Sequence, residues 1–353
     1  MHIHYFGEGA LLFDNNKKIY VSKNELNAIN NKIKKYRSLN RENINANGKS
    51  ILITENIEVS GKQGFFYPEL VNLFITNKCP QNCIHCFNDS NMNSNEMEYE
   101  DVIRIINMIN MKTPQITLTG GEPLIHKDFL KIVDSINGFD YKSVVTSLNV
   151  SNKDIVKSLE NFNEIQISIY GNDRLSHDYF TKNVGAFDRV WKNIKKLSST
   201  NANITISSMN NDPDKLEDIV KLAIDNGVKK IQFGELFKMG RAKINENKLC
   251  FKKLEPRVIF NLKSKYRNYI NIIYDEGCFT NSISVYCGAG ISKLDIDSNG
   301  FIYPCILSNR KSSLNILDYD NFFENNIFNY LDNVYFENIF CKGLENNPYA
   351  ILN

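Results

Sequence analysis

Residues 79–86 read CPQNCIHC, a stretch that places three cysteines within eight residues. Cys83 follows Cys79 by four positions and Cys86 follows by three more, with no fourth cysteine nearby. Structural zinc sites are closed by four protein ligands, whereas a reactive metal site keeps one position open. Three thiolates would hold three corners of a cubane iron–sulfur cluster and leave one iron without a protein ligand. The alternatives are a zinc site with a distant fourth ligand and a chance cluster of buried thiols.

The segments around the cysteines have the pattern of alternating strands and helices. An apolar run from Glu69 to Thr76 predicts a buried strand, and Asn95 to Met111 has helical spacing. The next predicted strand, QITLT at 115–119, runs directly into Gly-Gly-Glu-Pro at 120–123. In a parallel barrel, the loops that follow successive strands lie at the same face, where active sites are built. We therefore expect the cysteine loop and the Gly-Gly-Glu-Pro loop to be neighbours.

These two motifs resemble those of the radical S-adenosylmethionine (SAM) superfamily. The three cysteines match its C-x3-C-x2-C loop, with His85 where an aromatic residue is usual. The resemblance implies that they bind a 4Fe-4S cluster whose open iron is chelated by the amine and carboxylate of SAM. One electron then cleaves SAM to a 5′-deoxyadenosyl radical. Glycines allow a close backbone approach to a ligand, and a glutamate accepts hydrogen bonds from an amine. The candidate SAM-binding residues are therefore His85, Gly120, Gly121, Glu122 and Pro123.

The composition is that of an ordinary globular protein with room for an added domain. The chain has 353 residues, of which 42% are hydrophobic and 23% are charged. The formal net charge of +2 argues against a dominant nucleic-acid surface. No apolar run predicts a membrane span, and the first residues, MHIHYFGEGA, do not predict a signal peptide. Eight cysteines in such a chain indicate metal or redox chemistry in the cytoplasm.

We divide the chain into three regions. Residues 1–66 predict a small α+β module, with a hairpin around Asn15-Asn16, a helix capped by Ser22 and Glu25, and a polar loop over 38–50. Residues 67–245 alternate strands and helices in the manner of a parallel α/β barrel, and six strands fit the partial (β/α)6 TIM barrel of the superfamily. Residues 246–353 are cysteine-rich and less periodic. The barrel strands are expected at 69–76, 115–119, 142–146, 164–169, 202–207 and 229–233, with helices from about residues 95, 127, 151, 186 and 212.

Two further barrel loops resemble segments of peptide-modifying members of the superfamily. Ser168, on the fourth strand, would reach the ribose or carboxylate of SAM. His177, Asp178 and Thr181 match a recurring His-Asp…Thr signature, although closing the loop explains His177 and Asp178 at least as well as catalysis does. The stretch FKMGRA at 237–242 resembles a Gly-Arg-Ala turn that often follows the sixth strand.

The chain departs from the superfamily pattern at two places. Lys182 stands where a glycine is common, and we assign it no role. Thr146 and Ser147 end the third strand where Thr-Asn-Gly is common, so no ribose contact is assigned there.

The C-terminal region contains a second cysteine pattern. Cys287 and Cys305 flank Gly300 with twelve and four intervening residues, which resembles the first half of the auxiliary-cluster domain called SPASM. Only Cys341 follows, so the resemblance is to the shorter twitch domain, which binds one auxiliary 4Fe-4S cluster. It implies these three cysteines as ligands, with Cys278 as either a fourth ligand or a buried thiol. The Asn-Gly pair in this segment predicts a hairpin that brings the first two cysteines together.

Cys250 lies between the barrel and this region. Some radical SAM peptide epimerases hold a cysteine there, which donates a hydrogen atom to the product radical. Packing as a small apolar side chain between Leu249 and Phe251 explains Cys250 better.

The resemblance is closest to enzymes that modify ribosomally made peptides. It implies hydrogen abstraction from a small precursor peptide, giving a thioether, a carbon–carbon crosslink or an inverted α-carbon. The electron donor would be a flavodoxin or a ferredoxin-like protein, and residues 1–66 would bind the leader peptide or cap the barrel. The alternatives are a twitch-type oxidase or cyclase of a small molecule and an iron–sulfur electron carrier or scaffold, the latter disfavoured by the Gly-Gly-Glu-Pro loop. Neither a nucleic acid nor a membrane is expected as a partner.

Overall fold

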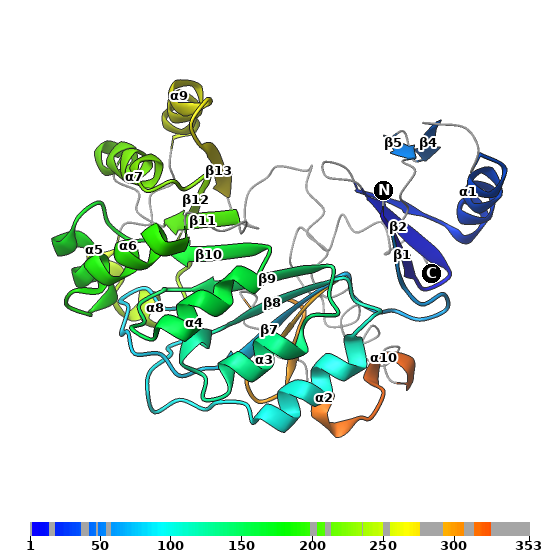
Figure 1. Ribbon diagram of the computed structural model, residues 1–353, viewed down its shortest axis with the longest axis horizontal. Coiled ribbons are helices and arrows are strands. Elements are labelled where there is room, and N and C mark those ends of the chain that lie inside the picture. Colours follow the sequence, from blue (N-terminus) through cyan, green and yellow to red (C-terminus); the bar gives the residue numbers. More distant parts are fainter. Residues whose placement is uncertain are drawn as a thin grey trace.

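The computed structural model describes residues 2–13, 18–36, 42–46, 49–53, 58–197, 203–208, 213–234, 236–249, 255–275, 292–306 and 314–325. Within them the chain has a mixed α/β fold, built on a large mostly parallel sheet and a smaller N-terminal sheet (Figure 1). None of the helices found there is both long and apolar enough to cross a membrane.

The large sheet contains nine strands of the described chain, in the order β13-β12-β11-β10-β9-β8-β7-β14-β15. Neighbouring strands from β13 to β14 are parallel, and only β15 is antiparallel to its neighbour. The six predicted barrel strands are confirmed as β7 to β12. The bounds are β7 (Leu70–Thr76), β8 (Gln115–Gly120), β9 (Tyr141–Thr146), β10 (Glu164–Ser168), β11 (Asn203–Ser208), β12 (Lys230–Gly234), β13 (Asn271–Asp275), β14 (Lys293–Ile296) and β15 (Ile302–Tyr303).

Residues beyond 245 extend this sheet at both of its ends. β13 adds to β12, and β14 pairs in parallel with β7, with Lys293 opposite Leu70. The hairpin predicted from the Asn-Gly pair is confirmed, because β14 and β15 pair antiparallel and Gly300 adopts a φ of +84° in the turn between them.

The two faces of the sheet differ in polarity because successive side chains of a strand point to opposite faces. One face is apolar and buried, with side chains such as Leu73, Leu118, Val144, Ile167 and Phe233. The alternate positions carry polar side chains, which line two cavities: Asn72, Thr117, Ser143, Gln166 and Gln232. The interior of the partial barrel therefore combines these polar side chains with apolar ones such as Phe74 and Val145.

Helices cover the apolar face (Figure 1). They begin within a few residues of the predicted starts, as α2 (Tyr99–Ile109), α3 (Phe129–Ser135), α4 (Lys153–Ser158), α6 (Ala186–Leu197) and α7 (Pro213–Asp225). α2 shows the pattern clearly, since Val102, Ile105, Ile106 and Ile109 recur at helical spacing and are buried. The other described helices of this part are α5 (Arg174–Thr181), α8 (Arg241–Ile244), α9 (Pro256–Tyr266) and α10 (Phe322–Asn325).

The N-terminal sheet has the order β3-β2-β1-β6, with β1 (His2–Phe6), β2 (Gly9–Phe13), β3 (Lys18–Val21) and β6 (Glu58–Gly61). The predicted hairpin is confirmed by the antiparallel pairing of β2 with β3. The predicted helix is α1 (Lys23–Tyr36), and Glu25 accepts hydrogen bonds from the backbone N–H and the hydroxyl of Ser22, at 2.9 and 2.8 Å.

The prediction of a polar loop over residues 38–50 was wrong. The structure has β4 (Glu42–Ala46) and β5 (Lys49–Ile53) paired antiparallel in this segment. The sequence did contain a hairpin signal, because the dipeptide Asn-Gly at 47–48 is typical of two-residue hairpin turns, but the polar composition of the segment obscured it.

Candidate functional site

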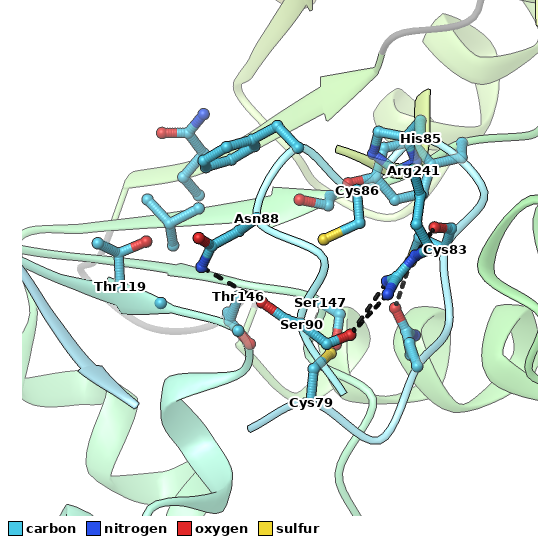
Figure 2. A pocket seen from close by; sticks show the side chains of 18 of the residues that line it. Cys79, Cys83, His85, Cys86, Asn88, Ser90, Thr119, Thr146, Ser147 and Arg241 are labelled. Carbon is cyan, nitrogen blue, oxygen red and sulfur yellow. Dashed lines mark hydrogen bonds between the residues drawn. The ribbon is translucent and has the colours of Figure 1, made fainter. Parts of the chain in front are cut away.

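The three cysteines of residues 79–86 lie on one loop beside a cavity of about 320 Å³ at the carboxyl ends of the barrel strands. Figure 2 shows this loop curving around the cavity, with Arg241 reaching it near Cys83. The predicted residues His85, Gly120, Gly121 and Ser168 also line the cavity, whereas Glu122 and Pro123 do not. The two predicted loops are thus neighbours. The remaining lining residues include Gln81, Asn88, Ser90, Thr119, Thr146, Ser147, Gln166, Tyr170, Gln232, Gly234 and Phe237.

The two glycines bring the backbones of the two loops into contact. The N–H of Gly121 donates to the carbonyl of Thr76 at 2.8 Å, and the N–H of Glu122 donates to the carbonyl of Lys78 at 2.9 Å. A Cβ on Gly120 would lie 1.9 Å from the Thr76 oxygen, and one on Gly121 would lie 2.4 Å from the Lys78 oxygen. A side chain would therefore push the Gly-Gly-Glu-Pro loop away from the residues that lead into Cys79.

Glu122 is fully buried beneath the cavity and organises the end of β9. Its carboxylate accepts hydrogen bonds from the Thr146 hydroxyl at 2.6 Å, from the Ser147 N–H at 2.8 Å, from the Ser147 hydroxyl, and from the Leu124 N–H at 3.1 Å. Burial raises the pKa of Glu122, and these four donors oppose that rise. Through them Glu122 fixes Thr146 and Ser147, which line the cavity.

Arg241, the first residue of α8, also holds the cysteine loop in place. Its guanidinium donates to the carbonyl of Cys83 at 2.8 Å, to the carbonyl of Ser90 at 3.0 Å and to the carboxylate of Asp89 at 2.7 Å. Its backbone N–H donates to the carbonyl of Cys86 at 2.9 Å. Gly240 precedes it with a φ of +50°, and a Cβ there would lie 2.5 Å from the same Cys86 oxygen. The Gly-Arg-Ala turn in FKMGRA is thus a support for the cysteines, a role that the sequence alone did not reveal.

The carboxyl end of α5 supports the loop from a third side. The N–H groups of Asn82 and Ile84 donate to the carbonyls of Thr181 and Phe180, at 3.1 and 3.0 Å. Lys182 ends this helix in the left-handed conformation, with a φ of +53°. That conformation favours glycine, which explains why glycine is common at this position in the pattern.

His177 and Asp178 close the loop after β10. Nδ1 of His177 accepts the N–H of Tyr170 at 3.2 Å, and the carboxylate of Asp178 accepts the N–H groups of Gly185 and Phe187, at 2.5 and 3.0 Å. Neither side chain lines the cavity. The geometry agrees with the structural explanation of this signature.

His85 occupies an aromatic environment. Its ring centroid lies 4.4 Å from that of Tyr170 and 4.6 Å from that of Phe180. Burial and the charge of Arg241 lower the pKa of His85 to about 3, so its ring is neutral at physiological pH. Histidine therefore packs here as the usual aromatic residue would.

The thiols themselves fit a cluster better than a single metal ion. Among the described residues, no group of three His, Cys, Asp or Glu side chains converges to hold one ion. A cubane does not need such convergence, because each cysteine binds a different iron. Burial raises the pKa of Cys79 to about 12 and also raises that of Cys83. A bound cluster would reverse this effect, because a coordinated thiol is deprotonated. Cys79, Cys83 and Cys86 are the residues that would hold it.

Comparison with known proteins identifies the chemistry. Residues 73–223 match the model of the radical SAM superfamily. The chain contains a radical SAM domain. Members of this superfamily use a 4Fe-4S cluster and SAM. A GTP 3′,8-cyclase from Clostridium perfringens (strain 13) is 25% identical over 263 residues, covering 67% of this chain and 80% of that protein. An uncharacterized protein from Methanocaldococcus jannaschii is 29% identical over 253 residues, covering 66% and 83%.

Solved structures resemble this chain over most of its length. SuiB from Streptococcus suis, bound to the precursor peptide SuiA, superposes with a TM-score of 0.66 at 16% identity, covering 93% of this chain and 88% of that one. Native anSMEcpe with bound AdoMet superposes with a TM-score of 0.52 at 18% identity, covering 74% of this chain and 82% of that one. At these identities the likeness is one of fold.

The second cysteine pattern is only partly within the described residues. Cys305 lines a second cavity of about 400 Å³, which shares the side chains of Thr119, Val145 and Gln166 with the first. The buried Asp295 fixes the backbone there, because its carboxylate accepts the Ile306 N–H at 2.7 Å and an Asn72 amide hydrogen at 2.6 Å. The other cysteines with a predicted role in this region lie outside the described part of the chain: Cys250, Cys278, Cys287 and Cys341.

Proposed function

We propose that this radical SAM enzyme abstracts a hydrogen atom from a residue of a small precursor peptide. Its own side chains would bind and orient the cluster, SAM and the peptide, while SAM supplies the 5′-deoxyadenosyl radical. Cys79, Cys83 and Cys86 would hold the cluster, and Gly120, Gly121 and Ser168 would border SAM. The product would be a thioether, a carbon–carbon crosslink or an epimerised residue.

The scarcity of cations in the lining of the two cavities is the observation that carries this proposal, and the second cavity also has the carboxylates of Glu164 and Asp295. Their described polar residues are mostly amides and hydroxyls, such as Asn72, Thr117 and Gln166. Arg241 and Lys293 are the cations among the described lining residues, and Arg241 already binds the cysteine loop. A nucleoside triphosphate needs several cations or N–H donors to compensate its charge. Neutral side chains of this kind suit the amides and side chains of a peptide.

The likeness to SuiB supports a peptide substrate as well. SuiB is seen with a precursor peptide, and the superposition leaves out only 7% of this chain, so it includes most of residues 1–66. We propose that this N-terminal module recognises the leader of the precursor. β3 lies at one end of the N-terminal sheet, where a peptide strand would add.

An auxiliary 4Fe-4S cluster and a separate electron donor complete the proposal. Cys305 would contribute one ligand to the auxiliary cluster beside the second cavity, together with Cys287, Cys341 and Cys278. The position of Cys305 on a cavity that adjoins the first supports this assignment. A flavodoxin or ferredoxin-like protein would supply electrons, and the thiolate-held cluster suits the reducing cytoplasm.

A small-molecule cyclase is the second candidate, because the GTP 3′,8-cyclase of Clostridium perfringens aligns over 67% of the chain. One experiment distinguishes the two candidate functions. The enzyme is reconstituted without oxygen and incubated with SAM, a reductant and either GTP or peptides encoded beside the gene, and the products are identified by mass spectrometry. We expect a mass change in a peptide together with 5′-deoxyadenosine. Conversion of GTP with every peptide unchanged would overturn the peptide assignment.

A further inference from the structure

One side-chain amide of the cysteine loop is buried at the cavity with its hydrogens unused. Gln81, which lies between Cys79 and Cys83 in the sequence, lines the cavity and is only 3% exposed. Its Nε2 is buried and has no hydrogen-bond partner among the described residues. Buried N–H groups without a partner are rare, because they lose their hydrogen bonds to water and gain none in return. The amide therefore indicates an acceptor that the bound state of the cavity supplies.

The amide of Asn88, which lines the same cavity, differs from that of Gln81 in this respect. Its Nδ2 donates to the side chain of Asn77 and to the hydroxyl of Ser90 at 3.3 Å (Figure 2). These bonds are internal to the loop and the residues that lead into it. The unused donor of Gln81 is thus not a general feature of the amides at this site.

The existing contact of Gln81 changes when Cys83 is bound to iron. Without a cluster, the Cys83 thiol donates to Oε1 of Gln81, with 3.4 Å between Sγ and Oε1. A coordinated cysteine has lost this hydrogen, so Oε1 would face the sulfur with no hydrogen between them. Half a turn of the amide exchanges Oε1 with Nε2 and presents an N–H donor to the Cys83 sulfur. The same turn gives the unused N–H a partner.

A second donor of the same residue is directed at Cys79. The backbone N–H of Gln81 donates to the Cys79 sulfur, and this bond opposes the rise that burial causes in the pKa of that thiol. Gln81 can therefore offer one N–H to each of two cysteines. Hydrogen bonds to the sulfurs are among the factors that set the reduction potential of an iron–sulfur cluster, because they stabilise the added negative charge of the reduced form.

We propose that the side-chain amide of Gln81 donates to the sulfur of Cys83 in the cluster-bound enzyme and raises the reduction potential of that cluster. Gln81 is then a positioning residue, which acts on SAM cleavage through the cluster. A higher potential makes the cluster easier to reduce and also a weaker reductant of SAM. The inference rests on the proposed assignment of Cys79, Cys83 and Cys86 to the cluster but not on the identity of the substrate.

The test measures the midpoint potential of the SAM-responsive cluster in the reconstituted enzyme. Titanium(III) citrate supplies one electron per cluster in the presence of redox mediators, and electron paramagnetic resonance follows the reduced form. Gln81→Leu removes the amide and leaves a side chain that suits a buried position. The matched control Asn82→Leu makes the same change at the next residue, whose side chain is exposed. Iron content shows whether each protein is loaded.

We expect Gln81→Leu to shift the reduction equilibrium roughly tenfold towards the oxidised cluster, which for one electron is a midpoint about 59 mV more negative. Asn82→Leu should keep the wild-type midpoint. An unchanged or more positive midpoint in a fully loaded Gln81→Leu enzyme would overturn the proposal. So would an equal shift in both variants, because the effect would then belong to the loop as a whole.

A second measurement needs no substitution. When the glutamine side-chain amides carry ¹⁵N, electron–nuclear double resonance on the reduced wild-type enzyme should detect a ¹⁵N nucleus coupled to the SAM-responsive cluster. Absence of this coupling would overturn the proposal even where Gln81→Leu fails to load iron. Failure of the cluster assignment itself is recognised separately, because a SAM-responsive signal would then persist in Cys79→Ala/Cys83→Ala/Cys86→Ala.

Discussion

The contact between the two site loops predicts a large effect of one methyl group at Gly121. In Gly121→Ala the new Cβ would lie 2.4 Å from the Lys78 oxygen and 2.8 Å from the Asn77 oxygen. The two backbones must separate by about 1 Å, and such overpacking costs about 1–3 kcal/mol. The shift also weakens the hydrogen bonds to Thr76 and Lys78, each of which contributes about 1 kcal/mol. We expect the free energy of unfolding to fall by about 3 kcal/mol.

Gly234→Ala is the matched control. Gly234 lines the same cavity, but a Cβ there meets no atom within 4 Å. Its unfolding free energy should stay within about 1 kcal/mol of the wild type. Both variants are compared by urea unfolding under anaerobic conditions, by iron content and by 5′-deoxyadenosine formation with dithionite. Equal behaviour of the two variants would refute the reasoning, because the loss would then follow from glycine replacement and not from the loop contact.

Three further predictions concern the supports of the loop. Arg241→Lys keeps the charge but cannot bind the carbonyls of Cys83 and Ser90 together, so urea unfolding should show a loss of about 2 kcal/mol and SAM cleavage should fall. Lys182→Gly removes the strain of a φ of +53° and should raise the unfolding free energy by up to about 1 kcal/mol; a lower unfolding midpoint would contradict this. Burial lowers the pKa of His177 from 6.5 to about 4, so the unfolded chain binds the extra proton between these values and stability falls as the pH drops. Between pH 7 and pH 5 His177 should cost about 2 kcal/mol, and His177→Asn should abolish that part of the pH dependence.

The local sequence pattern predicted the central part of the fold well. Alternating apolar runs and helical periods placed β7 to β12 and their helices, and the rule that loops of parallel strands share a face placed Cys79 near Gly120. These features depend on residues close in sequence, which a pattern can register.

Contacts between distant segments were not predictable in the same way. The pairing of β14 with β7 places Lys293 opposite Leu70, and Arg241 binds the carbonyl of Cys83. Neither contact affects the local periodicity of the sequence. Lys182 adopts a left-handed backbone conformation, which a glycine at this position would have indicated in the sequence and a lysine does not. The supporting role of the Gly-Arg pair at 240–241 could not be predicted, since its hydrogen-bond partners lie on another loop.

We infer that Cys79, Cys83 and Cys86 hold the cluster to which SAM binds. It is tested most directly by the electron paramagnetic resonance spectrum of the reconstituted, dithionite-reduced enzyme before and after SAM is added. The wild type should show a reduced cluster whose signal changes with SAM. The triple variant Cys79→Ala/Cys83→Ala/Cys86→Ala should lose that response and about four irons per chain. A SAM-dependent signal that persists in the triple variant would contradict the assignment.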